Sequence, residues 1–184
     1  MCGGDPEGSH INRNDQHNNR NRPRRGRITI EMANTYCQLY VHVIFAVKYR
    51  GGFIGESWQQ ELYRYMTGSA EAHGHKVYAI GGAKDHVHIL VSMSPTQSVS
   101  DMVRDLKRAS AMWIKERHLV DGNFAWQEGY GAFTYGKSQI SNVIVYIQNQ
   151  KQHHIGKTMQ EEYKEFLSIF GIEFDERYVF SEPN

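Results

Sequence analysis

Residues 85–91 have the sequence DHVHILV, an apolar run that contains two histidines. Successive side chains of a β-strand point to opposite faces of the sheet, so we expect His86 and His88 on the same face. The opposite face would carry Val87, Ile89 and Val91. The stretch therefore predicts a strand with one apolar face and two neighbouring imidazoles on the other.

The segments around this strand alternate between strand and helix patterns. Alternating apolar residues in 35–47 predict a first, half-buried strand. Helical spacing of apolar residues predicts helices that begin at the N-cap residues Ser57, Ser98 and Ser138. The predicted elements are, in order, strand 35–47, helix 57–73, strand 76–82, strand 86–93, a helix from 98, strand 130–136, helix 138–153 and helix 158–170.

The first six of these elements follow the order strand, helix, strand, strand, helix, strand. This order is typical of the ferredoxin-like fold, a split βαβ sandwich in which two helices cover one face of a four-stranded antiparallel sheet. We therefore predict an α+β domain with extra C-terminal helices. The other sheet face would be open to those helices, and it would carry Tyr40, His42, His86 and His88.

Composition and charge narrow the class of protein. A chain of 184 residues that is 40% hydrophobic has enough apolar material for one domain. It contains no apolar run long enough to cross a bilayer and no apolar signal-peptide segment at its start, so we expect a soluble, cytoplasmic protein without a membrane partner. Cys2 and Cys37 are its two cysteines, which excludes a disulfide framework and a cysteine-built metal site.

Residues 1–33 are predicted to form a disordered basic extension ahead of a single domain, residues 34–184. The first 31 residues hold six arginines against four acidic residues and almost no large apolar side chains. This segment is interpreted either as a basic arm that contacts phosphates or, preferably, as an extension upstream of a natural start at Met32. The basic body and acidic C-terminal segment that follow are compatible with nucleic-acid binding.

A second group of polar residues lies in the predicted helix 138–153. Tyr146 and Gln150 are four residues apart, so they project from the same helix face. Two imidazoles and one amide oxygen would form an incomplete site for a divalent cation, and such a mixed site suits Mg²⁺ or Mn²⁺ bound to a phosphodiester. A tyrosine beside that phosphate is a natural nucleophile for phosphoryl transfer.

Other interpretations of these residues stay open at this stage. An HxH strand taken alone is more often a polar sheet face, and Tyr130 and Tyr135 are rival nucleophiles. Three interpretations of His42 are open: it contacts a metal ligand, it contacts DNA, or it is a solvated strand residue. Asp85 either orients one imidazole or is a turn residue.

Three segments resemble the single-tyrosine HUH transposases of the smallest bacterial insertion sequences. They are DHVHILV at 85–91, WQEGYGAF at 126–133 and YIQNQ at 146–150, and the resemblance extends over residues 34–180. It implies that His86, Val87 and His88 are the HUH motif, that Tyr146 is the nucleophile and that Gln150 is the third metal ligand. It also implies single-stranded DNA substrates with hairpin ends, a 5′-phosphotyrosine intermediate, and a homodimer with composite active sites.

Basic residues near the predicted site are candidate phosphate contacts, with solvated surface as the alternative. These residues are Lys48, Arg50, Arg104, Lys107 and Arg108. Two rival functions remain: a domesticated or repeat-associated HUH endonuclease, and a non-catalytic ferredoxin-like module that binds nucleic acid. The first differs from a transposase in its flanking DNA, and the second in forming no covalent DNA adduct.

Overall fold

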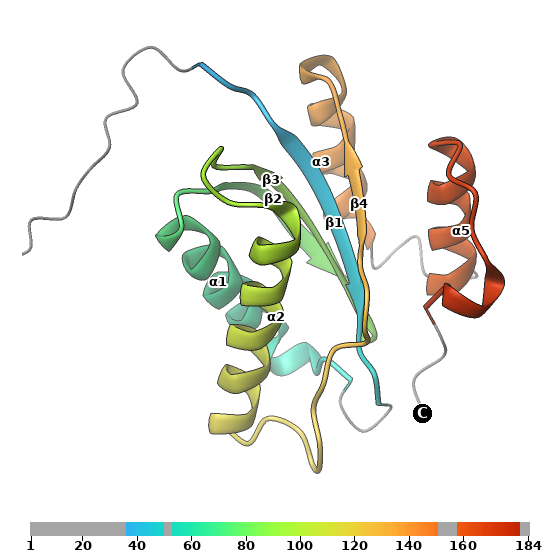
Figure 1. Ribbon diagram of the computed structural model, residues 1–184. Coiled ribbons are helices and arrows are strands. Elements are labelled where there is room, and N and C mark those ends of the chain that lie inside the picture. The colour runs from blue at the N-terminus through green and yellow to red at the C-terminus, as the bar shows by residue number, and fades with distance from the viewer. Residues whose placement is uncertain (1–35, 50–52, 151–157, 181–184) are drawn as a thin grey trace, which may run out of the picture. The chain divides into compact units, whose positions relative to one another are not determined.

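The computed structural model describes residues 36–49, 53–150 and 158–180 (Figure 1). The predicted extension 1–33 lies outside the described residues, so its disorder stays a prediction. The elements follow the predicted order of strands and helices. They are β1 (Tyr40–Ala46), α1 (Glu56–Ala72), β2 (Lys76–Gly82), β3 (His86–Ser92), α2 (Val99–Glu116), β4 (Gly131–Thr134), the short 3₁₀ helix η2 (Lys137–Gln139), α3 (Ile140–Gln148), α5 (Met159–Ile169) and η3 (Glu176–Tyr178).

The four strands form one antiparallel sheet in the order β2-β3-β1-β4. β1 and β3 are the two central strands, and their register pairs Ile44 with His88 and Ala46 with His86. Strand order and connections are those of the ferredoxin-like split βαβ unit. The predicted fold class is therefore confirmed.

The main core lies between one face of the sheet and helices α1 and α2 (Figure 1). Val41, Val43 and Phe45 of β1 contribute to it, together with the predicted apolar residues of β3. Burying these side chains is the main favourable term that holds both helices on the sheet. Among the helices that the structure describes, none combines the length and the hydropathy needed to span a membrane.

The second face of the sheet is covered as well. α3 packs on it through Val143 and Ile147, whereas Met159 and Leu167 of α5 pack beside it in a third cluster with Ile44 of β1. All seven residues of β1 are buried in consequence. The prediction of a half-buried first strand was therefore wrong, because the two C-terminal helices occupy the face that it would leave open.

Two of the three predicted N-caps were wrong. Ser98 accepts a hydrogen bond from the backbone N–H of Asp101 and begins α2 as predicted. The N-cap of α1 is instead Gly55, so α1 begins at Glu56, two residues earlier than an N-cap at Ser57 would place it. Ser138 lies inside η2, and α3 begins only at Ile140. Serine is common at helix starts, but packing of the helix on the sheet decides which residue is first.

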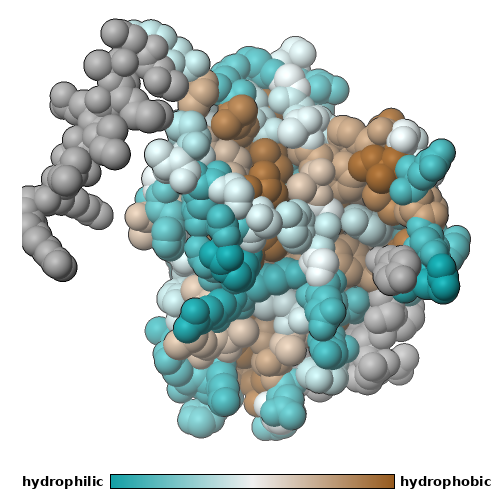
Figure 2. Space-filling model, viewed as in Figure 1, coloured by the Kyte–Doolittle hydropathy of each residue, from teal (hydrophilic) through white to brown (hydrophobic). Residues whose placement is uncertain are grey.

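Apolar side chains remain exposed at the end of α5. They are Ile169, Ile172 and Phe174. Figure 2 shows apolar surface, in brown, at the upper right, the side on which Figure 1 places α5. This patch is relevant to self-association, since contiguous exposed apolar surface commonly marks an interaction site.

Gly81 allows α3 to lie directly on the sheet. A Cβ atom at Gly81 of β2 would collide with the backbone carbonyl oxygen of Ile147 in α3. Because backbone cannot move aside as a flexible side chain can, a larger residue would push α3 away from β2. The position of Tyr146, one residue before Ile147, therefore depends on this glycine.

We predict that Gly81→Ala lowers the free energy of unfolding by about 1 to 3 kcal/mol, the usual cost of forcing an extra carbon into a packed site. Gly68→Ala is a matched control, because a Cβ atom at this exposed helical position meets nothing within 4 Å. Replacing a helical glycine by alanine should raise stability by about 0.5 to 1 kcal/mol. Urea unfolding of both variants measures the difference, and equal stability of the two would contradict the close contact of α3 with β2.

Candidate metal centre and active site

β3 positions His86 and His88 side by side on the face covered by α3 and α5. Their ring centroids are 4.9 Å apart, and both side chains are almost completely buried. Buried imidazoles need partners for their ring nitrogens, since an unpaired polar atom away from water is costly. The groups that surround these two rings therefore define what the site does.

Asp85 orients His86. Oδ1 of Asp85 lies 2.7 Å from Nδ1 of His86, within hydrogen-bond distance. A carboxylate accepts, so Nδ1 of His86 carries a hydrogen, and Nε2 is the ring nitrogen that remains to face the other groups of the site. Carboxylate–histidine pairs of this kind are usual behind metal ligands. The interpretation of Asp85 as an orienting residue is supported by this contact.

His42 contacts the ring of His88 and can orient it, as Asp85 orients His86. Nε2 of His42 lies 2.9 Å from Nδ1 of His88, and the two rings are stacked with centroids 5.1 Å apart. Burial lowers the pKa of His42 to about 3, so this ring is neutral and accepts a hydrogen bond through one nitrogen. If His88 donates from Nδ1, its Nε2 is the available lone pair. His42 is 0% exposed, which excludes the alternative that it contacts DNA directly in this conformation.

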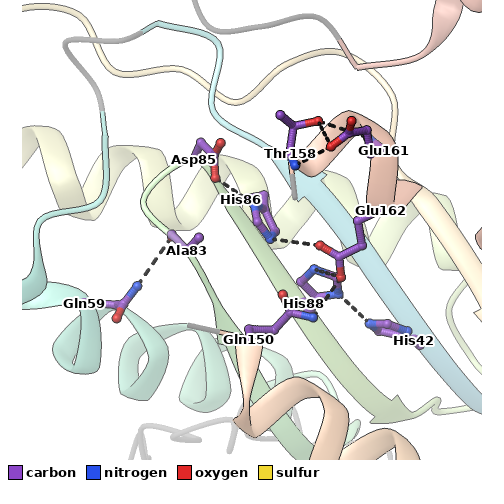
Figure 3. A network of polar contacts seen from close by, with 10 residues as sticks. All are labelled: His42, Gln59, Ala83, Asp85, His86, His88, Gln150, Thr158, Glu161 and Glu162. Atoms are coloured by element: carbon purple, nitrogen blue, oxygen red, sulfur yellow. Dashed lines mark hydrogen bonds and ion pairs between the residues drawn. The ribbon is translucent and has the colours of Figure 1, made fainter. Parts of the chain in front are cut away.

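Glu162 of α5 is the residue that sequence reasoning missed. Its Oε2 lies 3.9 Å from Nε2 of His86, and its Oε1 lies 3.6 Å from Nε2 of His88. Figure 3 shows the carboxylate directed at both rings, and one ligand atom of each residue lies within 4.8 Å of the others. Glu162 lies three residues after the buried Met159 in α5, a spacing that places both on one helix face but does not by itself indicate a cation ligand.

Burial raises the pKa of Glu162 to about 7, a value that includes an opposing effect of His86 and smaller raising effects of Glu165 and Asp85. A carboxyl group this deeply buried is ionised at low cost only if positive charge lies nearby. A cation between Glu162 and the two Nε2 atoms would supply that charge. The site is therefore suited to a cation on electrostatic grounds as well as by geometry.

Gln150 completes the group. Its Nε2 donates to Oε1 of Glu162 at 2.9 Å, whereas its own Oε1 is buried without a hydrogen-bond partner among the described residues. α3 ends at Gln148 and Asn149 is its C-cap, so Gln150 follows the helix and does not continue the face of Tyr146 as predicted. Two imidazole nitrogens and two oxygens form a mixed donor set that suits Mg²⁺ or Mn²⁺. The residues present thus fit such an ion.

Tyr146 lies next to this group in the same chain. Its ring centroid is 6.0 Å from that of His88 and 5.6 Å from that of Phe166. The half-buried ring lines a cavity of about 270 Å³ between α3 and α5, together with Glu162. A phosphate group that entered this cavity would meet both the phenol and the buried donor set.

Tyr130 and Tyr135 are less suitable as nucleophiles than Tyr146. Tyr130 packs against the core formed with α1 and α2, on the other side of the sheet from the histidines. Tyr135 lines the same cavity as Tyr146, but burial raises its pKa to about 12. A raised pKa disfavours the ionised phenol that attacks phosphorus, and it is Tyr146 whose ring lies beside that of His88, so Tyr146 is favoured.

The predicted phosphate contacts are scattered. Lys107 donates to the backbone carbonyls of Gln127 and Gly129, and burial lowers its pKa to about 8. Arg104 pairs with two aspartates of its own helix. Arg108 and Lys48 are exposed, and Arg50 lies outside the described residues. α2, which carries three of these residues, packs on the face opposite the histidines (Figure 1).

The sequence and fold match known transposases. The model of the family described as IS200-like transposase matches residues 35–150. The ISDra2 transposase TnpA of Deinococcus radiodurans is 30% identical over 118 residues, which cover 61% of this chain and 84% of that protein.

Two solved structures share the fold. One is a 1.90 Å crystal structure of a Deinococcus radiodurans protein described as a transposase, with a TM-score of 0.51 and 27% identity over 64% of this chain and 94% of that chain. The other is a REP-associated tyrosine transposase bound to a REP hairpin, with a TM-score of 0.51 and 13% identity over 84% of this chain and 96% of that chain. Since the family match includes both histidines, Tyr146 and Gln150, the chain belongs to the IS200-like transposase family.

Proposed function

We propose that this transposase cleaves and rejoins single-stranded DNA at the ends of an insertion sequence, with Tyr146 as the nucleophile and a divalent cation, Mg²⁺ or Mn²⁺, as cofactor. One observation carries the proposal: a buried group of two imidazoles, a carboxylate and a carboxamide lies beside a tyrosine that lines a cavity. Perturbed, buried titratable groups that line a cavity are common at active sites.

His86, His88 and Gln150 would hold the cation, and Glu162 would be a further ligand that the sequence did not suggest. When bound, the ion supplies Lewis-acid polarisation of the scissile phosphate and stabilises charge on the leaving oxygen. Asp85 and His42 act behind the ligands, because each fixes which nitrogen of its partner histidine is available.

The chemical step exchanges one phosphate ester for another. The oxygen of Tyr146 forms a bond to phosphorus, and the bond from phosphorus to the 3′ oxygen of the upstream strand breaks. The electron pair of that bond stays on the 3′ oxygen, which takes up a proton, and Tyr146 loses its own. The product is a 5′-phosphotyrosine and a free 3′ hydroxyl, and attack by a 3′ hydroxyl on the phosphotyrosine rejoins the DNA by the reverse path.

The DNA partner proposed for this chain is a single strand with hairpin ends. Family membership supports this partner, and the REP-associated relative of similar fold was solved with a hairpin bound. Lys48, Arg50 and Arg108 remain predicted phosphate contacts, whereas Arg104 and Lys107 already have protein partners. The cytoplasm remains the predicted location.

A homodimer is part of the proposal. The resemblance implies that two copies exchange their tyrosine helices, although Tyr146 already lies beside the histidines of its own chain. If two copies exchanged these helices, each Tyr146 would lie beside the same two histidines, now in the other copy. Exposed apolar side chains near the cavity support contact with a second copy: Val145, the neighbour of Tyr146, is 55% exposed, and Ile169, which lines the cavity, is 76% exposed.

A domesticated or repeat-associated endonuclease would use the same residues. It differs in the DNA around the gene, so hairpin-forming ends on both sides of the gene would favour the transposase. A non-catalytic nucleic-acid-binding module is less consistent with the site, because buried imidazoles and a buried carboxylate contribute nothing to a binding surface.

We predict that Tyr146→Phe abolishes the covalent protein–DNA adduct while DNA binding persists, because the substitution removes the nucleophilic oxygen and keeps the ring contacts. The measurement is a denaturing gel after incubation with Mg²⁺ or Mn²⁺ and single-stranded oligonucleotides that carry the DNA flanking the gene. Tyr135→Phe is the matched control, since it removes a hydroxyl from the same cavity. An adduct that survives Tyr146→Phe and is lost in Tyr135→Phe would transfer the role to Tyr135.

The raised pKa of Glu162 predicts how stability depends on pH in the metal-free protein. Between its ordinary pKa of 4.5 and the folded value of about 7, the folded protein keeps a proton on Glu162 that the unfolded chain releases. Glu162 therefore contributes a fall in the free energy of unfolding of up to about 3 kcal/mol as the pH rises through this window, whereas His42, whose pKa burial lowers to about 3, contributes a rise up to its ordinary pKa of 6.5. Urea unfolding at the two ends of the window, in the unsubstituted protein and in Glu162→Gln, isolates the fall due to Glu162, because His42 is common to both.

Glu162→Gln should remove most of that fall, because an amide does not ionise. Glu173→Gln, at an exposed position, is the control and should leave the fall unchanged. The same change of stability with pH in Glu162→Gln and in the unsubstituted protein would contradict the contribution assigned to Glu162.

A further inference from the structure

A second cavity, of about 250 Å³, adjoins the candidate metal centre. It lies between α1, the end of β2 and the C-terminal end of α3. Gln150 lines this cavity and also donates to Glu162, so one side chain connects the cavity to the cation ligands (Figure 3). The cavity is distinct from the one that contains Tyr146, which lies between α3 and α5.

The polar lining of this cavity consists mainly of carboxamides. The side chains are Gln59, Gln60, Gln148 and Gln150, with the phenol of Tyr63. Each carboxamide offers both a donor and an acceptor, and the described residues around the cavity include no charged side chain. A ligand that fits this lining is neutral and carries donors and acceptors side by side, which disfavours both a phosphate and a metal ion.

One of these side chains has a polar atom that lacks a partner among the described residues and has no role at the candidate metal centre. It is the hydroxyl of Tyr63, on a residue that is 5% exposed. Gln59 is also buried, and its Nε2 reaches the carbonyl of Ala83 only at 3.4 Å. A buried polar atom without a hydrogen-bond partner lowers the stability of the protein. A ligand that forms a hydrogen bond with such an atom therefore gains binding free energy.

The remaining residues that line this cavity are apolar or glycine, and the cavity is small. Ile80 and Ile147 contribute hydrophobic surface, and Gly81 and Gly82 contribute no side chain. The volume is below the range of about 300 to 1,000 Å³ that accommodates drug-sized ligands. A flat ring with polar edges and apolar faces meets these requirements, and glutamine is a known partner for the edge of a nucleobase.

We propose that this cavity, defined by Gln59, Tyr63, Gln148 and Gln150 and here named the base pocket, receives one unpaired nucleobase of the DNA strand next to the scissile phosphate. The inference rests on the proposed function, because only a strand whose phosphate reaches the cation ligands brings a base this close to Gln150. The base pocket would give the protein its own sequence preference at one nucleotide of the cleavage site.

The test uses the four free 2′-deoxynucleosides and deoxyribose as probes of the full, metal-free chain. Binding is followed by NMR through the side-chain amide signals of the glutamines. We expect one nucleoside to bind at least about tenfold more tightly than deoxyribose, a difference of about 1.4 kcal/mol, and to shift the signals of Gln59 and Gln148. Equal, weak binding of all five probes would overturn the proposal.

Two variants assign the binding to the base pocket. Tyr63→Phe removes only an unpartnered hydroxyl, so it should fold normally and weaken the preferred nucleoside by about two- to tenfold. Gln59→Leu should weaken it further, and Gln38→Leu, at an exposed glutamine elsewhere, should change nothing. Undiminished binding in Tyr63→Phe and in a folded Gln59→Leu would contradict the assignment, and if Gln59→Leu does not fold, Tyr63→Phe decides alone.

This test separates the base pocket from the proposed function, because a nucleoside has no phosphate and its binding needs neither Tyr146 nor a cation. A covalent adduct without nucleoside preference would refute the base pocket alone. Nucleoside preference without any adduct would support the pocket and refute the strand-transfer chemistry.

Discussion

Burial of a carboxylate against two imidazoles is the interaction on which the candidate site depends. β3 places His86 and His88 on one face of the sheet, and α5 folds across that face with Glu162 directed at both rings. Without positive charge at this point, a carboxyl group in such surroundings favours its protonated form, as its pKa of about 7 indicates. The ionised carboxylate of Glu162 therefore lowers the stability of the metal-free protein, and a bound cation would offset this effect.

The sheet fixes this site through ordinary packing on both of its faces. The apolar residues of β1 and β3 hold α1 and α2 on one face, which leaves the histidine face for α3 and α5. Asp85 and His42 then determine which nitrogens are available, one from the turn before β3 and one from the neighbouring strand. Gln150 lies where the donor set meets the base pocket, so chemistry and base recognition are adjacent.

Sequence patterns predicted the fold because local periodicity sets it. The order of strands and helices followed from local patterns. Apolar residues alternate in 35–47 and 86–93, and Ser98 is an N-cap. Glu162 was not predicted, because its role depends on a long-range contact between α5 and β3 that no local pattern encodes. The helix break at Asn149 was missed for a similar reason: the helix ends where packing of Ile147 on Gly81 gives way to the contact of Gln150 with Glu162.

Pulsed electron paramagnetic resonance of Mn²⁺ added to the full chain shows whether the two histidines bind one cation. We expect coupling of the Mn²⁺ electron spin to two imidazole nitrogens, reduced to one in His88→Ala. Bound Mn²⁺ without nitrogen coupling, or coupling that His86→Ala and His88→Ala both leave unchanged, would contradict it.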